Sequence, residues 1–100
     1  MRKARYSHLF VKALKKINGQ ELRNILNKRD EILSSEDIDH YKNLTKSLKK
    51  FKRVHVNSSY VILFFGDDNR VYFVDYAHHD DVYKHSTKDL KKYNELAFEE

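Results

Sequence analysis

Residues 51–83 read FKRVHVNSSYVILFFGDDNRVYFVDYAHHDDVY, and this stretch decides the fold. It contains three segments rich in β-branched and aromatic residues, which favour β-strands: 51–56, Tyr60–Phe65 and Val71–Ala77. Asn57-Ser58 and the Gly-Asp-Asp-Asn sequence at 66–69 supply residues typical of tight turns. Because consecutive hairpins reverse the chain each time, the stretch predicts an antiparallel three-stranded meander with Tyr60–Phe65 buried at its centre.

The N-terminal third of the chain has the periodicity of two amphipathic helices. Apolar residues recur at helical spacing in Leu9–Ile17 and again in Leu22–Leu33. Ser7 is suited to cap the first helix, and Asn18-Gly19 is suited to end it. Residues 6–8 are compatible with a short strand ahead of the first helix. We therefore predict an α+β fold in which a helical hairpin packs on a small antiparallel sheet.

The predicted core joins the helical hairpin to the central strand. Only these segments are apolar enough to form it, and its members are Leu14, Ile17, Leu22, Ile25 and the strand Val61–Phe65. Segment 35–48 is polar and lysine-rich, with apolar residues spaced for one or two helical turns, and 84–100 predicts a short polar helix. A chain of 100 residues suits one domain, with its core at about 4–85 and a polar extension at 86–100.

The positive charge of the chain is concentrated in one segment. Twenty Lys and Arg residues against 15 Asp and Glu give a formal charge of +5 and a pI near 9.4. Residues 42–53 contain six Lys or Arg residues and no acidic residue. Such a stripe suits a polyanion such as nucleic acid, with an affinity that falls as salt rises. A solvated lysine-rich surface has the same composition, so the charge alone leaves both interpretations open.

Several classes of protein are excluded by what the sequence lacks. It has no cysteine, which excludes disulfides, thiolate metal sites and a cysteine nucleophile. Its two glycines are too few for a P-loop or a dinucleotide-binding fingerprint. No apolar run approaches the ~20 residues of a membrane span, and no apolar stretch follows the basic N-terminus as in a secretion signal. We therefore expect a cytoplasmic protein with no membrane partner.

Side chains suited to acid–base chemistry fall on these strands and just after them. Arg53 and His55 share one face of the first strand because strand side chains alternate, and His79 and Tyr83 follow the last strand. RNA cleavage without a metal needs a base for the 2′-OH, an acid for the leaving oxygen and cations around the phosphorane. Histidine serves as base or acid near neutral pH. We therefore predict His55, His79, Arg53 and Tyr83 as the catalytic residues.

A metal site is the alternative use of the histidines. Adjacent residues of a strand point to opposite faces, so His78 and His79 are expected to be poor joint ligands. A site made of His55, His79 and a carboxylate stays open as an alternative. The prediction is that the protein uses no metal and no cofactor.

Three pieces of the sequence, taken in order, resemble the RelE/ParE toxin superfamily of toxin–antitoxin systems. They are Leu48–Val56, Ser59–Phe64 and His79–Tyr83. The resemblance covers residues 4–85, and the histidine that precedes Tyr60-Val61-Ile62 is similar to the YafQ branch of ribosome-dependent mRNA endonucleases. It implies a RelE-like fold and a type II toxin that cleaves ribosome-bound mRNA by metal-independent acid–base chemistry. It also implies a small, acidic, partly disordered antitoxin as partner.

The resemblance assigns roles to the candidate residues. His55 and His79 fall on the catalytic histidines of the YafQ branch, and Tyr83 falls on the aromatic residue that ends its motif. Neighbouring cations favour a neutral His55, which makes it the expected base. Asp80 and Asp81 favour a protonated His79, which makes it the expected acid.

The charged residues around the histidines are expected to hold the RNA. Arg53 and Lys52 would supply charge to the transition state, and the residues predicted to bind RNA are Lys42, Lys49, Lys50, Lys52 and His78. Three positions depart from the pattern. Val61 stands where RelE has a phosphate-binding arginine, although YafQ is apolar there; Ser59 stands where YafQ has an acidic residue, and Lys42 where it has a histidine. Two alternatives stay open: a ParE-like gyrase inhibitor, which the same superfamily includes, and a non-catalytic RNA- or partner-binding module, which the changes at Ser59 and Lys42 would favour.

Overall fold

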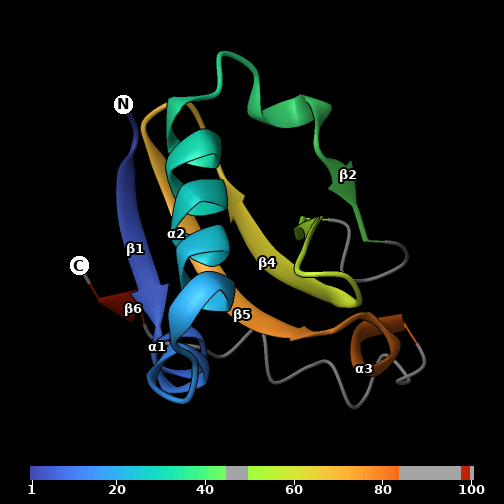
Figure 1. The fold of residues 1–100 in the computed structure, drawn as a ribbon. Helices are drawn as coiled ribbons and strands as arrows, with labels where there is room; N and C mark the ends of the chain where they lie inside the picture. The colour runs from blue at the N-terminus through green and yellow to red at the C-terminus, as the bar shows by residue number, and fades with distance from the viewer. Residues whose placement is uncertain (45–49, 84–97, 100) are drawn as a thin grey trace.

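A helical hairpin covers one face of a β-sheet in this chain. The structure, a computed structural model, describes residues 1–44, 50–83 and 98–99. The helices are α1 (His8–Lys15), α2 (Gly19–Ser34), α3 (His79–Tyr83) and a short 3-10 helix, η1 (Ile38–His40). The strands are β1 (Lys3–Ser7), β2 (Lys42–Asn43), β3 (Lys52–Val56), β4 (Tyr60–Gly66), β5 (Arg70–His78) and β6 (Phe98–Glu99). In Figure 1, α2 crosses in front of the sheet, and this arrangement confirms the predicted α+β fold.

The described strands form one mixed sheet in the order β2-β3-β4-β5-β1-β6. β3, β4 and β5 pair antiparallel, which confirms the predicted meander. β1 pairs with β5 in parallel, from Lys3 opposite Arg70 to Tyr6 opposite Phe73, so the prediction of an antiparallel sheet is corrected at this strand. The helical hairpin and the first two strands of the meander separate β1 from β5 in the chain, and a long connection of this kind lets two neighbouring strands run in the same direction.

The helical hairpin begins and turns where the sequence predicts. Ser7 is the N-cap of α1: its Oγ accepts a hydrogen bond from the Phe10 amide at 3.1 Å and donates one to the Val74 carbonyl. α1 ends at Lys15, and Gly19 opens α2 with a φ of +63°, a conformation that favours glycine. None of the described helices combines the length and the apolar character that a membrane crossing needs.

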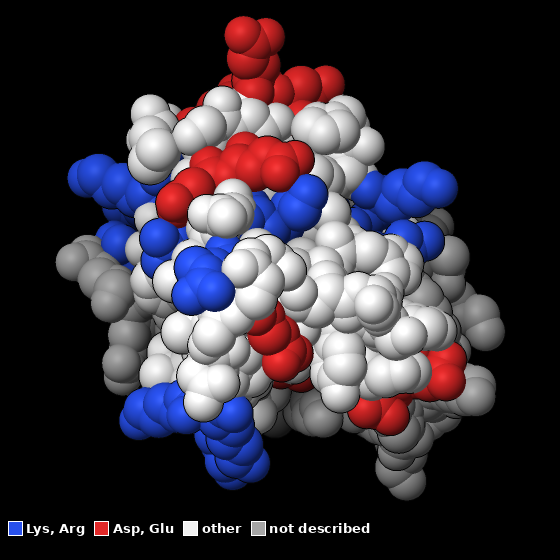
Figure 2. All heavy atoms as spheres, in the orientation of Figure 1, with Lys and Arg blue, Asp and Glu red and all other residues white. Residues whose placement is uncertain are grey.

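The outer face of α2 carries charges of both signs. Figure 2 shows acidic and basic side chains separated by uncharged ones across this view. Lys28 and Glu31 form an ion pair along the helix at 3.0 Å. This face is therefore an ordinary solvated surface, without the single sign of charge that attracts a polyanion.

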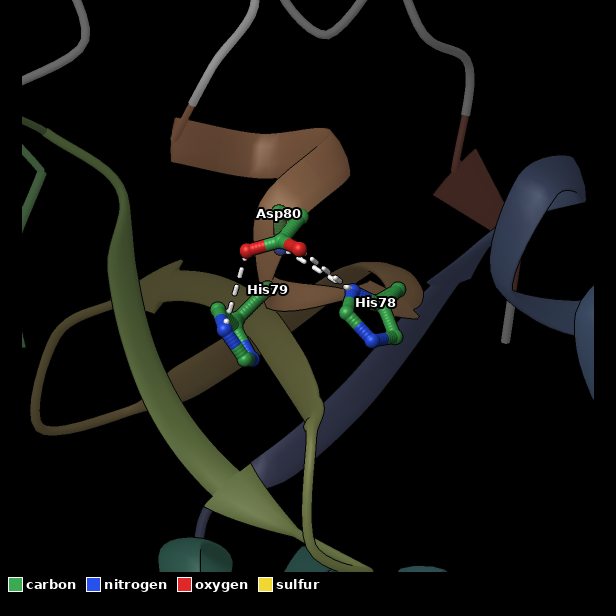
Figure 3. A group of neighbouring side chains, drawn as sticks. All are labelled: His78, His79 and Asp80. Atoms are coloured by element: carbon green, nitrogen blue, oxygen red, sulfur yellow. Dashed lines mark hydrogen bonds and ion pairs between the residues drawn. The ribbon is translucent and has the colours of Figure 1, made fainter.

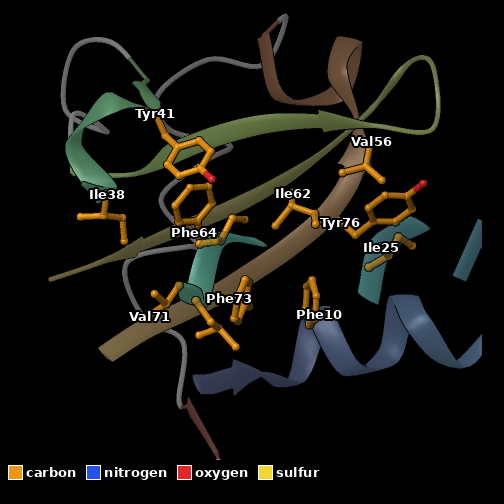
Figure 4. Packing of buried hydrophobic residues seen from close by; sticks show 12 residues of the cluster. Phe10, Ile25, Ile38, Tyr41, Val56, Ile62, Phe64, Val71, Phe73 and Tyr76 are labelled. Atoms are coloured by element: carbon orange, nitrogen blue, oxygen red, sulfur yellow. The ribbon is translucent and has the colours of Figure 1, made fainter. Parts of the chain in front are cut away.

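β4 is buried on both of its faces and forms the centre of the core. Ile62 and Phe64 face the helices, in a cluster that includes Phe73 (Figure 4). Val61 and Leu63 belong to a second cluster on the opposite face of the sheet. All five side chains are fully buried, so the prediction that this apolar run forms the central strand is confirmed.

The helices contribute to the core unequally. Ile25 of α2 is fully buried, as predicted, and so is Phe10 of α1, which the prediction had not included. Leu14 and Ile17 are only partly buried and pack against the margin of the cluster, and Leu22 is also partly buried. The core is therefore centred on the aromatic contact of α1 with the sheet, where the Phe10 ring stacks on the Phe73 ring at 5.5 Å.

Both turns of the meander depend on local backbone requirements. Asn57 and Ser58 have φ values of +57° and +60°, in the left-handed region that asparagine tolerates better than most residues. A Cβ atom at Gly66 would lie 2.2 Å from the Arg70 carbonyl oxygen, so only glycine fits there. The predicted turns at these two places are confirmed.

The segment between α2 and β3 contains one of the helical turns that its spacing favours, and then a strand in place of a second turn. It forms η1 and then the short strand β2, which pairs antiparallel with β3. Ile38, Tyr41 and Leu44 are buried, so their spacing reflects contact with the sheet. Residues 45–49 lie outside the described part of the chain.

The C-terminal helix predicted at 84–100 is corrected at its end. Phe98–Glu99 form β6, which pairs antiparallel with β1, while residues 84–97 and 100 lie outside the described part of the chain. The Phe98 ring contacts the rings of Phe65 and Tyr72 at 5.7 and 5.2 Å. These aromatic contacts favour a strand here because they anchor Phe98 at the sheet.

Replacing Ile62 with alanine is expected to lower the free energy of unfolding by about 2–5 kcal/mol, because the truncation leaves a cavity in the fully buried strand. Chemical denaturation of both proteins measures the change. Val11→Ala is the matched control, since Val11 is 38% exposed and its loss should cost less than about 0.5 kcal/mol. An unchanged midpoint for Ile62→Ala would contradict the central position of β4.

Candidate active site

The structure brings His55 and His79 together at one end of the sheet. His55 is exposed on β3, and His79 is the first residue of α3, directly after β5. Their ring centroids lie 5.9 Å apart. The antiparallel pairing of β3 with β4 and of β4 with β5 makes them neighbours, because it places His55 opposite Val61 and Val61 opposite Ala77.

The turn between β3 and β4 holds His79 in place. The Ser59 carbonyl accepts a hydrogen bond from the His79 backbone amide at 2.7 Å and contacts the ring Nδ1 at 2.9 Å. A carbonyl only accepts, so the His79 Nδ1 carries the proton in this contact. This leaves Nε2 as the nitrogen that exchanges a proton or binds another group.

The other nitrogen of His79 faces a carboxylate. Its Nε2 lies 3.0 Å from Asp80 Oδ1. A carboxylate also only accepts, so the ring satisfies both contacts when it carries a proton on each nitrogen. Nε2 is therefore the position at which a proton or another cation would link the ring to Asp80, and the role of His79 as the acid stays a prediction.

Two cations lie beside each other on the same face as His55. Antiparallel partners share a face, and Lys42 of β2 stands directly opposite Arg53 of β3. Arg53 and His55 in turn lie on one face of β3 because they are two residues apart. Positive charges on neighbouring strands can both contact an anion such as a phosphate.

Lys52 does not belong to this group, and its predicted role is corrected. Its side chain is only 8% exposed and lies on the opposite face of β3 from Arg53. Its Nζ donates to Asn43 Oδ1 at 3.0 Å and lies 3.6 Å from an Asp39 carboxylate oxygen. A buried ammonium held by these partners has a structural role, because leaving them would cost its hydrogen bonds.

The structure describes only part of the remaining predicted residues. Lys50 is exposed, with its ammonium 5.1 Å from the ring centre of Phe51 and 5.2 Å from that of Phe65. Lys49 lies outside the described part of the chain. The backbone of Tyr83 ends α3, whereas its side chain is outside the described part, so its predicted role stays a prediction.

His78 and His79 do not point to opposite faces, as the sequence had suggested. Their rings stack, with centroids 4.8 Å apart and an interplanar angle of 24°. The prediction was wrong because β5 ends at His78 and α3 begins at His79, so the alternation of a strand does not extend across the pair. The His78 ring also meets the Tyr60 ring edge-on at 5.3 Å.

A polar network that the sequence analysis missed supports the turn that carries Ser59. The Asn57 side-chain amide donates to the Glu21 carbonyl at 3.1 Å and to the Tyr76 hydroxyl at 3.2 Å. The Tyr76 hydroxyl in turn donates to Glu21 Oε2 at 2.9 Å, and burial raises the pKa of Tyr76 to about 12. This network links α2 to the turn, so it positions His79 through Ser59. Asn57 at a turn was its only signal in the sequence.

Comparison of the sequence with known proteins identifies the family of this chain. No protein-family profile matches the sequence. The chain is 43% identical over 76 residues to the Methanocaldococcus jannaschii protein named "Putative toxin RelE4", a match that covers 74% of this chain and 79% of that protein. An uncharacterized protein of Methanosarcina mazei is 42% identical over 76 residues, covering 74% of this chain and 85% of its own. The chain therefore belongs to the RelE toxin family.

Solved structures agree with this assignment at the level of the fold. E. coli YafQ superposes with a TM-score of 0.64 at 16% identity, covering 83% of this chain and 99% of YafQ. The isolated E. coli RelE toxin gives a TM-score of 0.64 at 16% identity, covering 92% and 98% of the two chains. A chain of the intact E. coli RelBE toxin–antitoxin complex gives 0.62 at 16% identity, covering 78% and 96%.

Proposed function

We propose that this protein is the toxin of a type II toxin–antitoxin system and cleaves mRNA on the ribosome. The observation that carries the proposal is the approach of His55 and His79 to within 5.9 Å, measured between ring centroids. Two imidazoles at this separation can act on opposite sides of one phosphodiester. The proposed site of action is the cytoplasm, where translating ribosomes are found.

The proposed reaction is an attack within the RNA itself. His55 accepts the proton of the 2′-OH as its oxygen forms a bond to the adjacent phosphorus. His79 gives its Nε2 proton to the 5′-oxygen as the bond between phosphorus and that oxygen breaks. The products are a 2′,3′-cyclic phosphate and a free 5′-OH, and every proton in these steps is moved by a side chain.

Arg53 and Lys42 would stabilise the phosphorane. Their positions opposite each other on β3 and β2 place two positive charges on the face of His55. Charge fixed before the reaction stabilises the extra negative charge of the transition state without reorganisation. His79 is kept in its orientation by the Ser59 carbonyl, so its proton is delivered from a constant position.

An antitoxin is the proposed partner that keeps this activity in check. The net charge of +5 favours an acidic protein, and a disordered segment that folds on binding can cover a large basic surface. The fold similarity to the toxin of the RelBE complex supports this proposal.

Purified protein added to translating ribosomes is expected to cut a defined mRNA, and to leave the same mRNA intact when ribosomes are absent. Mapping of the 5′ ends and analysis of the 3′ ends identify the cuts and the cyclic phosphate. A parallel assay follows supercoiling of plasmid DNA by gyrase. Intact mRNA together with inhibited supercoiling would replace the proposal with a ParE-like gyrase inhibitor, and intact mRNA with normal supercoiling would leave a binding module.

A further inference from the structure

The junction of β5 and α3 gathers three side chains that are suited to hold a metal ion. We propose that His78, His79 and Asp80 bind a divalent transition metal ion such as Zn²⁺, and that the bound ion inhibits the protein. One nitrogen of each ring and one carboxylate oxygen lie within 4.8 Å of one another. Figure 3 shows the Asp80 carboxylate beside the two stacked imidazole rings, with one oxygen toward His79 and the other toward His78.

The distances between the ligand atoms are close to those of a tetrahedral site. Zinc binds nitrogen or oxygen at about 2.0–2.2 Å, so two ligand atoms of a tetrahedron lie about 3.3–3.5 Å apart. His79 Nε2 is 3.0 Å from Asp80 Oδ1, and His78 Nδ1 is 3.9 Å from Asp80 Oδ2. One value is shorter and the other longer than the ideal one, and the two nitrogens approach different oxygens of the carboxylate, so side-chain rotations would bring the three ligands onto one ion. A water molecule would complete the coordination.

The ring of His79 is already arranged as in a metal ligand. A histidine that binds a metal usually donates its other ring N–H to a carbonyl or carboxylate, which orients the ring and fixes its tautomer. The Ser59 carbonyl takes this place at 2.9 Å from His79 Nδ1. In the neutral ring the Nε2 lone pair therefore faces Asp80, and either a proton or a metal ion can link these two electron-rich atoms.

His78 also directs a lone pair to this place. The Asp80 backbone amide donates to His78 Nδ1 at 3.1 Å, so that nitrogen is an acceptor and its lone pair points to the start of α3. A metal ion would bind this lone pair in place of the hydrogen bond from the Asp80 amide. The donor set consists of two imidazole nitrogens and one carboxylate oxygen. Zn²⁺, Co²⁺, Ni²⁺ and Cu²⁺ bind such a set more tightly than Mg²⁺ and Ca²⁺ do, because the latter two ions prefer oxygen ligands alone.

The inhibitory effect rests on the proposed function, whereas metal binding does not. In the proposed reaction His79 delivers a proton from Nε2, and a metal ion bound at Nε2 takes the place of that proton. His79 would also be held by Asp80 and His78 through the ion, away from the leaving oxygen. The ion is thus an inhibitor and has no part in the reaction.

Calorimetric titration of the full chain with ZnCl₂, without RNA or ribosomes, tests the binding. One ion should bind per chain with saturation, and Asp80→Asn and His78→Gln should each weaken binding at least about tenfold, as loss of even an outer-shell partner of a metal site does. His8→Gln is the matched control, because His8 is an exposed histidine at the start of α1 and should leave the affinity unchanged. Circular dichroism of every variant shows that it is folded.

The results separate this proposal from the proposed function. Absence of one-to-one binding, or equal affinity for wild type, Asp80→Asn and His78→Gln, would overturn the site whatever the protein does to mRNA. In the ribosome assay, Zn²⁺ at saturating concentration should suppress cleavage at least about tenfold and a chelator should restore it. Full cleavage by the zinc-loaded protein would overturn the proposed inhibition. If the protein binds zinc but never cleaves mRNA, the metal site is supported and the proposed nuclease function is refuted.

Discussion

Replacing either His55 or His79 with glutamine is expected to slow ribosome-dependent mRNA cleavage by at least about 10²-fold, because each change removes one proton-transfer step. The rate of appearance of cut mRNA under single-turnover conditions measures the effect. The double variant should lose less than the product of the two single losses, since the base and the acid act in one transition state. His8→Gln, at an exposed position of α1, should cleave at the wild-type rate.

The pH dependence of the same reaction tells the two histidines apart. The base must be neutral, so its titration produces a rate that rises with pH; the acid must be protonated, so its titration produces a rate that falls as pH increases. In the residual activity, His55→Gln should remove the rising limb and His79→Gln the falling limb. Full cleavage by the double variant would contradict this chemistry.

Replacing the 2′-OH of the scissile nucleotide with hydrogen is expected to abolish cleavage, because this hydroxyl is the proposed nucleophile. No group of the protein replaces this RNA hydroxyl in the proposed steps. The loss of cleavage rate should therefore exceed the loss that either histidine variant causes. The measurement uses an mRNA with one deoxynucleotide at the mapped cut. The control carries the deoxynucleotide one position away and should be cut normally. Cleavage of the scissile-deoxy mRNA at an unchanged rate would require another nucleophile, such as water.

Local sequence patterns predicted the elements well where one pattern dominates. The apolar run Tyr60–Phe65 predicted a central strand, and residues 61–64 of it are fully buried because both faces of β4 meet a hydrophobic cluster. Ser7 predicted the start of α1, since its hydroxyl can satisfy an amide that the first turn leaves unpaired. Patterns of this kind depend on residues only a few positions apart.

The predictions failed where contacts between distant residues decide. The parallel pairing of β1 with β5 and the end strand β6 follow from which sheet edge is available, and no local pattern shows this. Lys52 has the composition of an RNA-binding residue, yet contacts to Asp39 and Asn43 hold it on the other face of β3.

The sequence by itself determined the helical hairpin, the meander and the residue types that acid–base chemistry requires, because periodicity and turn residues express these directly. Only the tertiary structure decided where the histidines lie relative to one another. It placed His55 near His79 through two strand pairings, and it stacked His78 on His79 because a strand ends and a helix begins between them. Such distances are set by the packing of the whole sheet, to which many distant residues contribute at once.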